Sequence, residues 1–304
     1  MQPTSRWLPS YLLLAVLWGS AFAFIKLALE SFTPIGVGFG RMLLGLSTLA
    51  LISIATKTAF PPRATWFRIC VMALLAASIP WSLVAFAETR IPSALASIIG
   101  SSVPLTTLVV IMVFFRDEKP TRQRIVGLLF GFMGILIVVG VWNHMAGAVL
   151  IGVVACFIAN TSFAVSLPYA RRHLSGGAGA VELSPLSLTT GLFTFAALET
   201  FPLAMVGGVI KAPIALPALL GLLAVGCLSS GLAYLLNFRI IAWTDATTAS
   251  TITYIIPLIA VIIGTLFLGE PMTWNQPVGG VIILFGAAVA QGLITLPIRS
   301  RQVD

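Results

Sequence analysis

Ten long apolar segments follow one another along this chain, with only short polar breaks between them. A membrane-spanning helix needs about 20 mostly apolar residues, so ten spans use roughly 200 positions and leave no room for a separate water-soluble domain. With 59% hydrophobic and 9% charged residues, ordinary soluble enzymes and disordered, collagen-like or coiled-coil proteins are excluded. The predicted fold class is an all-α polytopic membrane protein with ten transmembrane helices. We expect them at 8–29, 33–55, 66–87, 92–115, 122–141, 146–170, 184–208, 216–242, 245–268 and 274–296.

The breaks near Pro34, 88–92 and Asp245 are the weakest, so nine or eleven helices are alternatives.

The basic residues gather at every second break. The chain has 17 Lys and Arg against 9 Asp and Glu, an excess that in a soluble protein indicates nucleic-acid binding. Only Arg90 and Lys211 fall on one side of the predicted topology. By the positive-inside rule, the other side is cytoplasmic and carries both termini, so the charge is a topology signal and no nucleic-acid partner is expected. The basic residues on that side are Arg6, Lys57, Arg63, Arg68, Arg116, Lys119, Arg122, Arg124, Arg171, Arg172, Arg239, Arg299 and Arg301.

We therefore expect a multi-pass protein of the cell inner membrane, with a first span that is retained rather than cleaved as a signal peptide.

The two halves of the chain resemble each other. Residues 94–105 read ALASIIGSSVPL and residues 247–258 read TTASTITYIIPL, with several identities at an offset of 153. Further identities follow at an offset of 152 or 151. The matched pairs include Ala96 and Ala249, Ser97 and Ser250, Pro104 and Pro257, Glu118 and Glu270, Thr121 and Thr273, Gly127 and Gly279, Gly134 and Gly286, Gly140 and Gly292, Pro34 and Pro185, and Gly40 and Gly191.

Each half holds five expected helices, an odd number, so the second copy enters the membrane in the opposite orientation. We predict two inverted five-helix repeats, 8–141 and 146–296. Such repeats are typical of secondary transporters, which bind substrate near the midplane and work by alternating access. A duplication retained only for folding is the alternative.

Several stretches resemble the EamA repeats of the drug/metabolite transporter superfamily. They are WGSAFAFIK (18–26), PIGVGFGR (34–41), and the paired ends VPL…DEKPT (103–121) and IPL…LGEPMT (256–273). The resemblance implies a ten-helix exporter of amino acids or other metabolites. Residues 79–105 look most like the YddG-type exporters of aromatic amino acids. Two departures are Arg116-Asp117-Glu118 in place of Leu-Gly-Glu, and the lack of a basic counterpart to Arg41 in the second repeat.

Charged residues inside the membrane are expensive and become functional candidates. Arg41 lies about eight residues into its helix, roughly 12 Å deep at 1.5 Å per residue. It can bind a substrate carboxylate or brace the repeats. Lys26 can snorkel to the interface. Glu199 and Glu88 are the candidate proton relays, and facilitated export without protons is equally consistent.

Two related helix faces present hydroxyl groups beside a proline. In 92–115 they are Ser97, Ser101 and Pro104; in 245–268 they are Ser250, Tyr254 and Pro257. Proline removes a backbone donor and kinks a helix, so both prolines are candidate hinges. The faces predict a pseudo-symmetric substrate cavity, and close packing of small residues is the alternative.

Other polar and aromatic residues complete the predicted substrate site. Trp81 and Tyr234 correspond at an offset of 153. An apolar pocket with a few placed hydroxyls, amides and aromatic edges suits an aromatic or aliphatic amino acid. The remaining candidates are Trp18, Ser20, Ser78, Ser82, Asn160 and Asn237.

No enzyme chemistry is visible in the sequence. His144 and His173 fall in breaks on opposite sides of the membrane, and Cys70, Cys156 and Cys227 show no metal-binding spacing. We therefore expect no cofactor and no metal. The expected partners are a small-molecule substrate and the lipid bilayer, with the monomer as the functional unit. The alternatives are a drug or nucleotide-sugar carrier of the same fold, a membrane-embedded enzyme and a helix bundle that transports nothing.

Overall fold

A computed structural model describes residues 4–114, 121–140, 147–174, 183–243 and 252–294. Within these ranges the protein is helical, and its one extended contact is an isolated bridge between Phe32 and Ile210. Eight helical stretches are long and apolar enough to cross a membrane, and the segments expected to be ninth and tenth contain the shorter apolar helices Ile252–Leu266 and Asn275–Ala290. The eight are Trp7–Ala28, Pro34–Ala55, Arg63–Glu88, Ser93–Val110, Arg122–Val139, Gly147–Ala170, Pro185–Gly207 and Leu216–Asn237.

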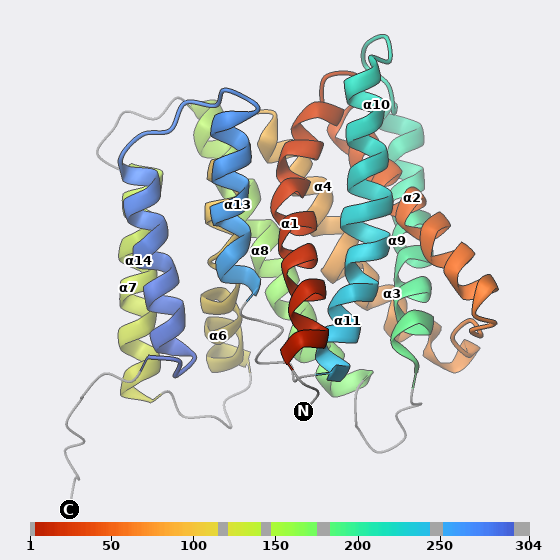
Figure 1. The fold of residues 1–304 in the computed structure, drawn as a ribbon, viewed down its shortest axis with the longest axis horizontal. Coiled ribbons are helices and arrows are strands. Elements are labelled where there is room, and N and C mark those ends of the chain that lie inside the picture. Colours follow the sequence, from red (N-terminus) through yellow and green to blue (C-terminus); the bar gives the residue numbers. More distant parts are fainter. Residues whose placement is uncertain (1–3, 115–120, 141–146, 175–182, 244–251, 295–304) are drawn as a thin grey trace, which may run out of the picture.

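The helices run up and down through one bundle (Figure 1). In chain order they are α1 (Thr4–Ala28), α2 (Pro34–Ala55), η1 (Arg63–Thr65), α3 (Trp66–Ala73), η2 (Leu74–Ser78), α4 (Ile79–Glu88), α5 (Ser93–Gly100), α6 (Val103–Phe114), α7 (Arg122–Val139), α8 (Gly147–His173), α9 (Pro185–Gly207), α10 (Leu216–Leu223), η3 (Ala224–Leu232), α11 (Ala233–Trp243), α13 (Ile252–Leu266) and α14 (Asn275–Ala290).

The same start signal opens α2 and α9. Proline occupies the first helical position, where its missing N–H costs nothing. The residue before it is the N-cap: Thr33 Oγ1 accepts from the Gly36 N–H at 3.0 Å, and Ser184 Oγ accepts from the Ser187 N–H at 3.2 Å.

Two spans contain an irregularity that the sequence did not signal. The stretch α3–η2–α4 and the stretch α10–η3–α11 each carry a π-helical segment in the middle. A π-segment widens the helix by one residue per turn and often marks a functional site.

The fourth expected helix is divided in two. It leaves helical geometry at Ser101 and Ser102, between α5 and α6, just before Pro104. The proline ring disfavours helical geometry in the residues before it, which accounts for the position of the break. Pro257, by contrast, lies inside a continuous α13.

Close packing joins α7 to α14 along glycines. A Cβ atom at Gly127 would lie 2.6 Å from the Gly286 carbonyl oxygen, and one at Gly134 would lie 2.8 Å from the Gly279 carbonyl oxygen. Only glycine permits the two backbones to approach this closely. The other extensive helix pairings are α2 with α9, α1 with α13, and α4 with α8.

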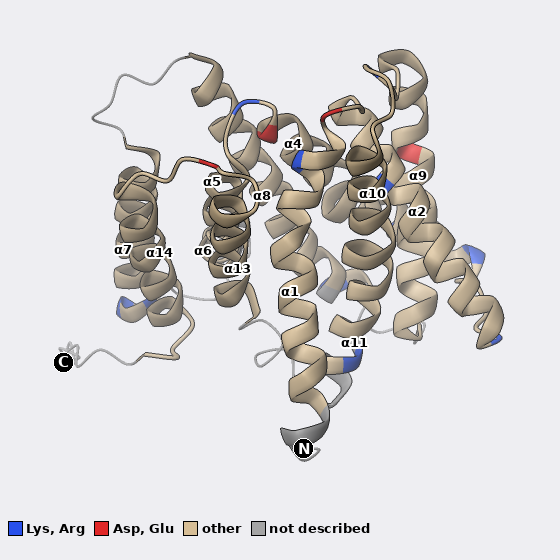
Figure 2. Ribbon diagram, turned by 45° about the horizontal axis from the view of Figure 1, so that its top comes forward, with Lys and Arg blue, Asp and Glu red and all other residues tan. Residues whose placement is uncertain are grey.

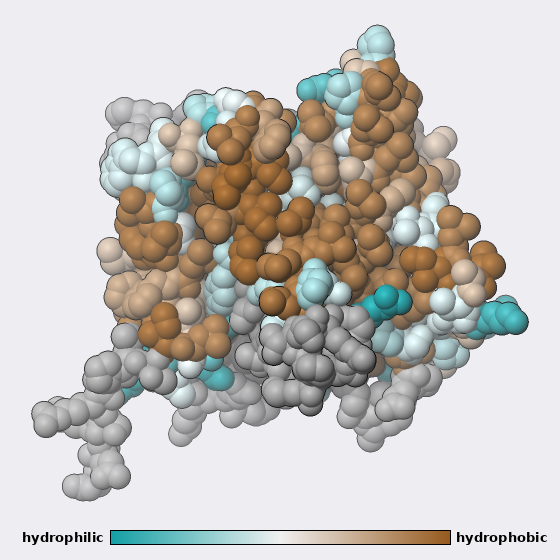
Figure 3. All heavy atoms as spheres, viewed as in Figure 1, coloured by the Kyte–Doolittle hydropathy of each residue, from teal (hydrophilic) through white to brown (hydrophobic). Residues whose placement is uncertain are grey.

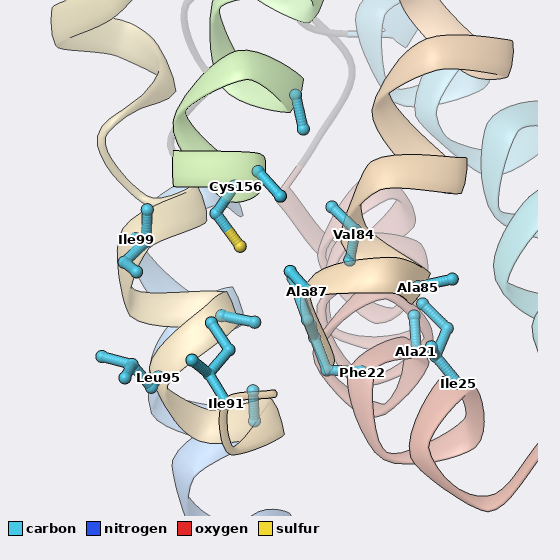
Figure 4. Packing of buried hydrophobic residues seen from close by; sticks show 14 of the residues in the cluster. Ala21, Phe22, Ile25, Val84, Ala85, Ala87, Ile91, Leu95, Ile99 and Cys156 are labelled. Carbon is cyan, nitrogen blue, oxygen red and sulfur yellow. The ribbon is translucent and has the colours of Figure 1, made fainter. Parts of the chain in front are cut away.

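The main apolar core lies where α1, α4, α5 and α8 meet. Figure 4 shows Phe22, Val84, Ile91 and Cys156 converging from these helices. The outer surface is also largely apolar, with brown surface along the helices in the view of Figure 3. A large apolar exterior is what a bilayer-embedded bundle presents to lipid.

Candidate functional site

A cavity of about 200 Å³ lies in the middle of the bundle. Its walls come from α1, α4, α5, α8, α11 and α13, so the site is assembled from both halves of the chain. Aromatic side chains dominate the wall, with two amides and three hydroxyl groups among them. The aromatic members are Trp18, Phe22, Trp81, Phe163 and Tyr234, and the polar members are Ser97, Ser101, Asn160, Asn237 and Thr253.

One side of the aromatic wall is fixed by edge-to-face packing. Trp18 and Tyr234 meet with ring centroids 5.9 Å apart, and Phe193 supports Tyr234 from behind at 5.3 Å. The Trp18 indole N–H donates to the carbonyl oxygen of Ser229, inside η3, at 3.2 Å. A π-segment therefore supplies the acceptor that orients a cavity-lining indole.

Arg41 fixes the opposite side of the wall from behind. Its guanidinium carbon lies 3.7 Å from the Trp81 ring centroid, a close cation–π contact. Its Nε donates to Ser230 Oγ, also in η3, at 2.7 Å. Arg41 is 1% exposed and does not line the cavity. It acts on the cavity through Trp81.

Asn160 ties α8 to the break in the fourth helix. Its Nδ2 donates to the Ile99 carbonyl at 2.8 Å and to Ser102 Oγ at 3.2 Å. These contacts join α8 to the turn between α5 and α6. The Asn160 side-chain oxygen has no hydrogen-bond donor among the described residues, and that oxygen belongs to a cavity-lining amide.

The serines of the fourth helix bond within their own helix. Ser97 donates to the Ala94 carbonyl at 2.8 Å and Ser101 to the Ile98 carbonyl at 2.6 Å. Each hydroxyl oxygen retains acceptor capacity toward the cavity.

A vestibule of about 650 Å³ adjoins the cavity at one end. The two share Trp18, Val103, Phe163, Asn237 and Thr253. From there the vestibule widens between α6, the start of α7 and the end of α14, where exposed residues line its mouth. Its polar mouth residues are Thr121, Gln123, Arg124 and Gln291.

The other end of the cavity is closed, and we call it the sealed end. Beyond Phe22 and Val84 the next side chains on α1 and α4 are buried, with Ile25 at 1% and Glu88 at 0% exposure. Lys26 Nζ donates to the backbone carbonyls of Glu88 at 2.7 Å and Ile91 at 3.4 Å.

Glu270 adds a second contact across the sealed end. Its carboxylate accepts from the Ser93 N–H at 2.8 Å, Ser93 Oγ at 2.9 Å and the Ala94 N–H at 3.1 Å. A residue from the loop after α13 thus caps the N-terminus of α5, where the helix dipole favours a negative charge.

Seven of the predicted substrate-binding residues line the cavity: Trp18, Trp81, Ser97, Ser101, Asn160, Tyr234 and Asn237. Pro104 lines the vestibule.

The other candidates lie elsewhere. Ser20 donates to the Val16 carbonyl of its own helix, and Ser82 packs against Gly38 of α2. Tyr254 does not line the cavity, whereas its neighbour Thr253 does. Ser250 is outside the described residues. Lys26, Ser78, Glu199 and Pro257 do not line the cavity either.

Glu199 and Ser78 form a small polar cluster between α9 and η2. The Glu199 carboxylate accepts from Ser78 Oγ at 2.5 Å and from Cys70 Sγ at 3.2 Å. The contact parallels that of Arg41 and Ser230: in each case a charged side chain bonds to a serine in a π-segment.

Three aromatic or hydroxyl-bearing residues of the cavity were missed in the sequence. Phe22 lies four residues after Trp18, and Phe163 lies three residues after Asn160, so helical spacing places each on the face of a residue already chosen. Thr253 corresponds at an offset of 153 to Gly100, which also lines the cavity. The correspondence of Ser101 with Tyr254 led to the choice of Tyr254, which is one residue away from the cavity-lining Thr253.

The described residues contain no group of three or more His, Cys, Asp or Glu side chains placed to hold a metal ion.

Comparison with known proteins places this geometry in a family. The model of the EamA-like transporter family matches residues 5–140 and again residues 150–291. The chain belongs to the EamA-like transporter family. It is therefore a multi-pass membrane transporter of the drug/metabolite type.

Relatives share the full length of this transporter. The uncharacterized inner membrane transporter YedA of Escherichia coli K12 is 28% identical over 297 residues, covering 94% of this chain and 91% of that protein. An uncharacterized transporter of Archaeoglobus fulgidus is 22% identical over 278 residues, covering 88% and 92%. One crystal structure with 17% identity matches 96% of this chain and 99% of its own with a TM-score of 0.62, which supports the fold.

Proposed function

We propose that this transporter exports small metabolites, foremost amino acids with aromatic or other hydrophobic side chains, across the cell inner membrane by alternating access. The observation that carries the proposal is the cavity itself: aromatic walls enclose a few amides and hydroxyls, one end adjoins a vestibule, and the other is sealed. A site accessible from one side only is what alternating access requires of each conformation.

The wall chemistry supports an amphipathic substrate. Trp18, Phe22 and Phe163 offer apolar faces and ring edges to an aromatic or branched side chain. Asn237 offers donors and an acceptor, and Asn160 adds the acceptor oxygen of an amide whose N–H groups are bound within the protein. This combination suits a polar head group such as the paired ammonium and carboxylate of an amino acid.

We infer that the ten expected helices form two inverted five-helix repeats, 8–141 and 146–296. Three observations support this arrangement. Helices in corresponding positions, α2 with α9 and α7 with α14, pack against each other. Each half carries a π-segment in its third helix. The same N-cap and proline start the second helix of each half.

We infer that the vestibule faces the cytoplasm and that both termini lie on that side. Arg122 and Arg124 begin α7 beside the vestibule, and Arg239 lies near the end of α11. Figure 2 shows basic residues at this end of α7 and α11 and acidic residues toward the opposite end. The positive-inside rule assigns the basic end to the cytoplasm. We propose that the monomer is the functional unit.

Counterflow in proteoliposomes tests the proposal. Vesicles are loaded with unlabelled L-phenylalanine, L-tryptophan, L-leucine, ethidium or UDP-glucose, and entry of the same labelled compound is followed. We expect exchange of the hydrophobic amino acids above the level of protein-free vesicles. Exchange of ethidium or UDP-glucose alone would favour a drug or nucleotide-sugar carrier, and no exchange of any probe would contradict the proposal.

A matched pair of variants tests the site. Phe22→Ala removes a cavity wall, whereas Phe67→Ala removes a ring that is 78% exposed on the outer surface. We expect Phe22→Ala to weaken apparent affinity for L-phenylalanine by about tenfold, because about 1.4 kcal/mol of apolar contact is lost. Phe67→Ala should leave it unchanged. Equal changes of apparent affinity in the two variants would show that the substrate does not bind in the cavity.

A further inference from the structure

Glu88, the last residue of α4, has an unusual environment for a carboxylate. The residue is 0% exposed, and neither carboxylate oxygen has a hydrogen-bond partner among the described residues. A buried carboxylate without a partner is costly when ionised, by several kcal/mol, whereas its neutral form needs far less compensation.

The other described acids near the membrane ends differ from Glu88. Glu199 accepts hydrogen bonds from Ser78 and Cys70, Glu270 accepts three at the start of α5, and Glu30 is exposed. Among the described Asp and Glu residues, only Glu88 is both buried and without a partner.

Two positive charges lie near Glu88 and favour its ionised form, but neither bonds to its carboxylate, and burial opposes them. From α1, Lys26 binds the backbone carbonyls of Glu88 and Ile91. From α2, Arg41 stacks on Trp81 and bonds to Ser230.

The remaining titratable groups around Glu88 give little support to an ionised form. They are Glu270, whose negative charge opposes that of Glu88, Cys156 of α8, and Arg90, which lies over the Phe86 ring in the following turn. α5 and η2, which also pack against α4, contain no charged residue.

Glu88 also has a defined position relative to the cavity. Trp81 and Val84 line the cavity, and Glu88 follows Trp81 by seven residues and Val84 by four, on the same face of α4. The carboxyl group therefore lies about one helical turn, or roughly 6 Å, beyond the closed limit of the cavity. A movement that opens the sealed end to water would hydrate this group.

We propose that Glu88 is the binding site of a coupling proton, which makes the transporter a proton–substrate antiporter. When the sealed end is open to water, the carboxylate takes a proton from the outer aqueous phase and becomes a carboxylic acid. Closure buries the neutral acid. Substrate entering the cavity from the vestibule then displaces the proton to the cytoplasmic phase, and the ionised carboxylate favours the return to the open seal. One proton moves inward for each substrate moved outward. The inference rests on the proposed transport function and adds its driving ion.

The test uses proteoliposomes of the full chain with labelled L-phenylalanine, at symmetric pH and with a gradient of about two pH units, acid inside. An antiporter accumulates substrate as protons leave. For one proton per substrate the limit is about a hundredfold, because each pH unit is a tenfold ratio of proton concentration and drives a tenfold ratio of substrate concentration. We expect Glu88→Gln to retain counterflow at symmetric pH and to lose gradient-driven accumulation. Glu30→Gln, which neutralises an exposed acid toward the same end, should retain both.

A measurement on purified protein needs no substrate. We expect the infrared C=O stretching band of a protonated carboxyl group in wild type at neutral pH, retained in Glu30→Gln and lost in Glu88→Gln.

The outcomes separate the two proposals. Absence of counterflow for every probe overturns the proposed function, while the infrared band still decides whether Glu88 holds a proton. Counterflow without any effect of the gradient in wild type overturns the coupling alone, even if Glu88→Gln does not fold. A band that is absent from wild type at neutral pH, or that persists in Glu88→Gln, also overturns it.

Discussion

The sealed end and the vestibule end of the cavity are held in different ways. At the sealed end, Lys26 and Glu270 make charge-assisted hydrogen bonds to segments of the chain far from them in sequence, in an apolar surround. At the vestibule end, Gln123 donates to the Val289 and Ile294 carbonyls, which joins α7 to the helix it already packs against. The sealed end is therefore held by contacts between segments far apart in the sequence, and the vestibule end by a contact between α7 and the segment that contains and follows α14.

This difference indicates which end of the cavity requires more free energy to open. A hydrogen bond to a charged group contributes about 1.5–3 kcal/mol to stability, and its contribution is larger where water is excluded. Opening the sealed end must break several such bonds, whereas the vestibule is already open. The closed seal is expected to dominate in the absence of substrate, and a transport cycle must supply enough binding energy to offset it.

The largest effect is expected from breaking the Glu270 contact. Glu270→Ala removes three hydrogen bonds and leaves the first N–H groups of α5 without an acceptor. The loss lowers the free energy of opening the sealed end by about 3 kcal/mol or more. We expect the population with an open seal to rise by at least about a hundredfold.

Labelling of Ile91→Cys by a membrane-impermeant maleimide, with the native cysteines replaced by alanine, measures this opening. Gln123→Ala is the control, because it loses a hydrogen bond at the vestibule end only. Unchanged labelling in Glu270→Ala would show that Glu270 does not hold the seal.

A smaller effect is expected where the wall between the two ends is braced. Arg41→Lys keeps the positive charge but loses the planar group that stacks on Trp81 and the Nε donor to Ser230. We expect counterflow to slow by about tenfold, corresponding to about 1.4 kcal/mol. Arg63→Lys is the matched control, since its guanidinium lies 5.8 Å from Trp66 at the surface. Equal counterflow rates in both variants would show that Arg41 does not support the cavity wall.

The smallest effect is expected at the junction of the two ends. Asn160→Ala frees the break between α5 and α6 by removing two hydrogen bonds, one to Ile99 and one to Ser102. A loss of about 1 kcal/mol weakens apparent substrate affinity by about fivefold. Thr161→Ala, one residue away on an exposed face, should have no effect on counterflow kinetics. If the Thr161 variant weakens affinity as much, the effect does not come from the break.

Much of this architecture could be predicted because membrane spans are specified by simple physics. A long apolar run that must satisfy its own backbone is a helix, and eight of the ten expected segments satisfy the length and composition of a span. The matched glycines of 122–141 and 274–296 indicated the internal repeat but not that these two helices touch, as α7 and α14 do along Gly127 and Gly134.

The irregular backbone could not be predicted in the same way. The sequence of η2, LLAAS, carries no proline or glycine, so nothing local distinguishes it from α-helix. What accompanies it is tertiary: Ser78 bonds to Glu199 of α9, a residue more than a hundred positions away. The site was found in part because Trp81 and Tyr234 correspond in the two halves, whereas Phe22 and Thr253 depend on which helix face turns inward, and packing decides that.

Reciprocal accessibility of the two ends tests the central claim most directly. Thr107→Cys lies in the vestibule and Ile91→Cys at the sealed end. Each is labelled with an impermeant maleimide in the same background, with and without saturating L-phenylalanine. Alternating access predicts fast labelling of Thr107→Cys and slow labelling of Ile91→Cys without substrate, and a shift of both rates in opposite directions when substrate is added. Rates that rise together, or that both stay constant with a transported substrate, would contradict it.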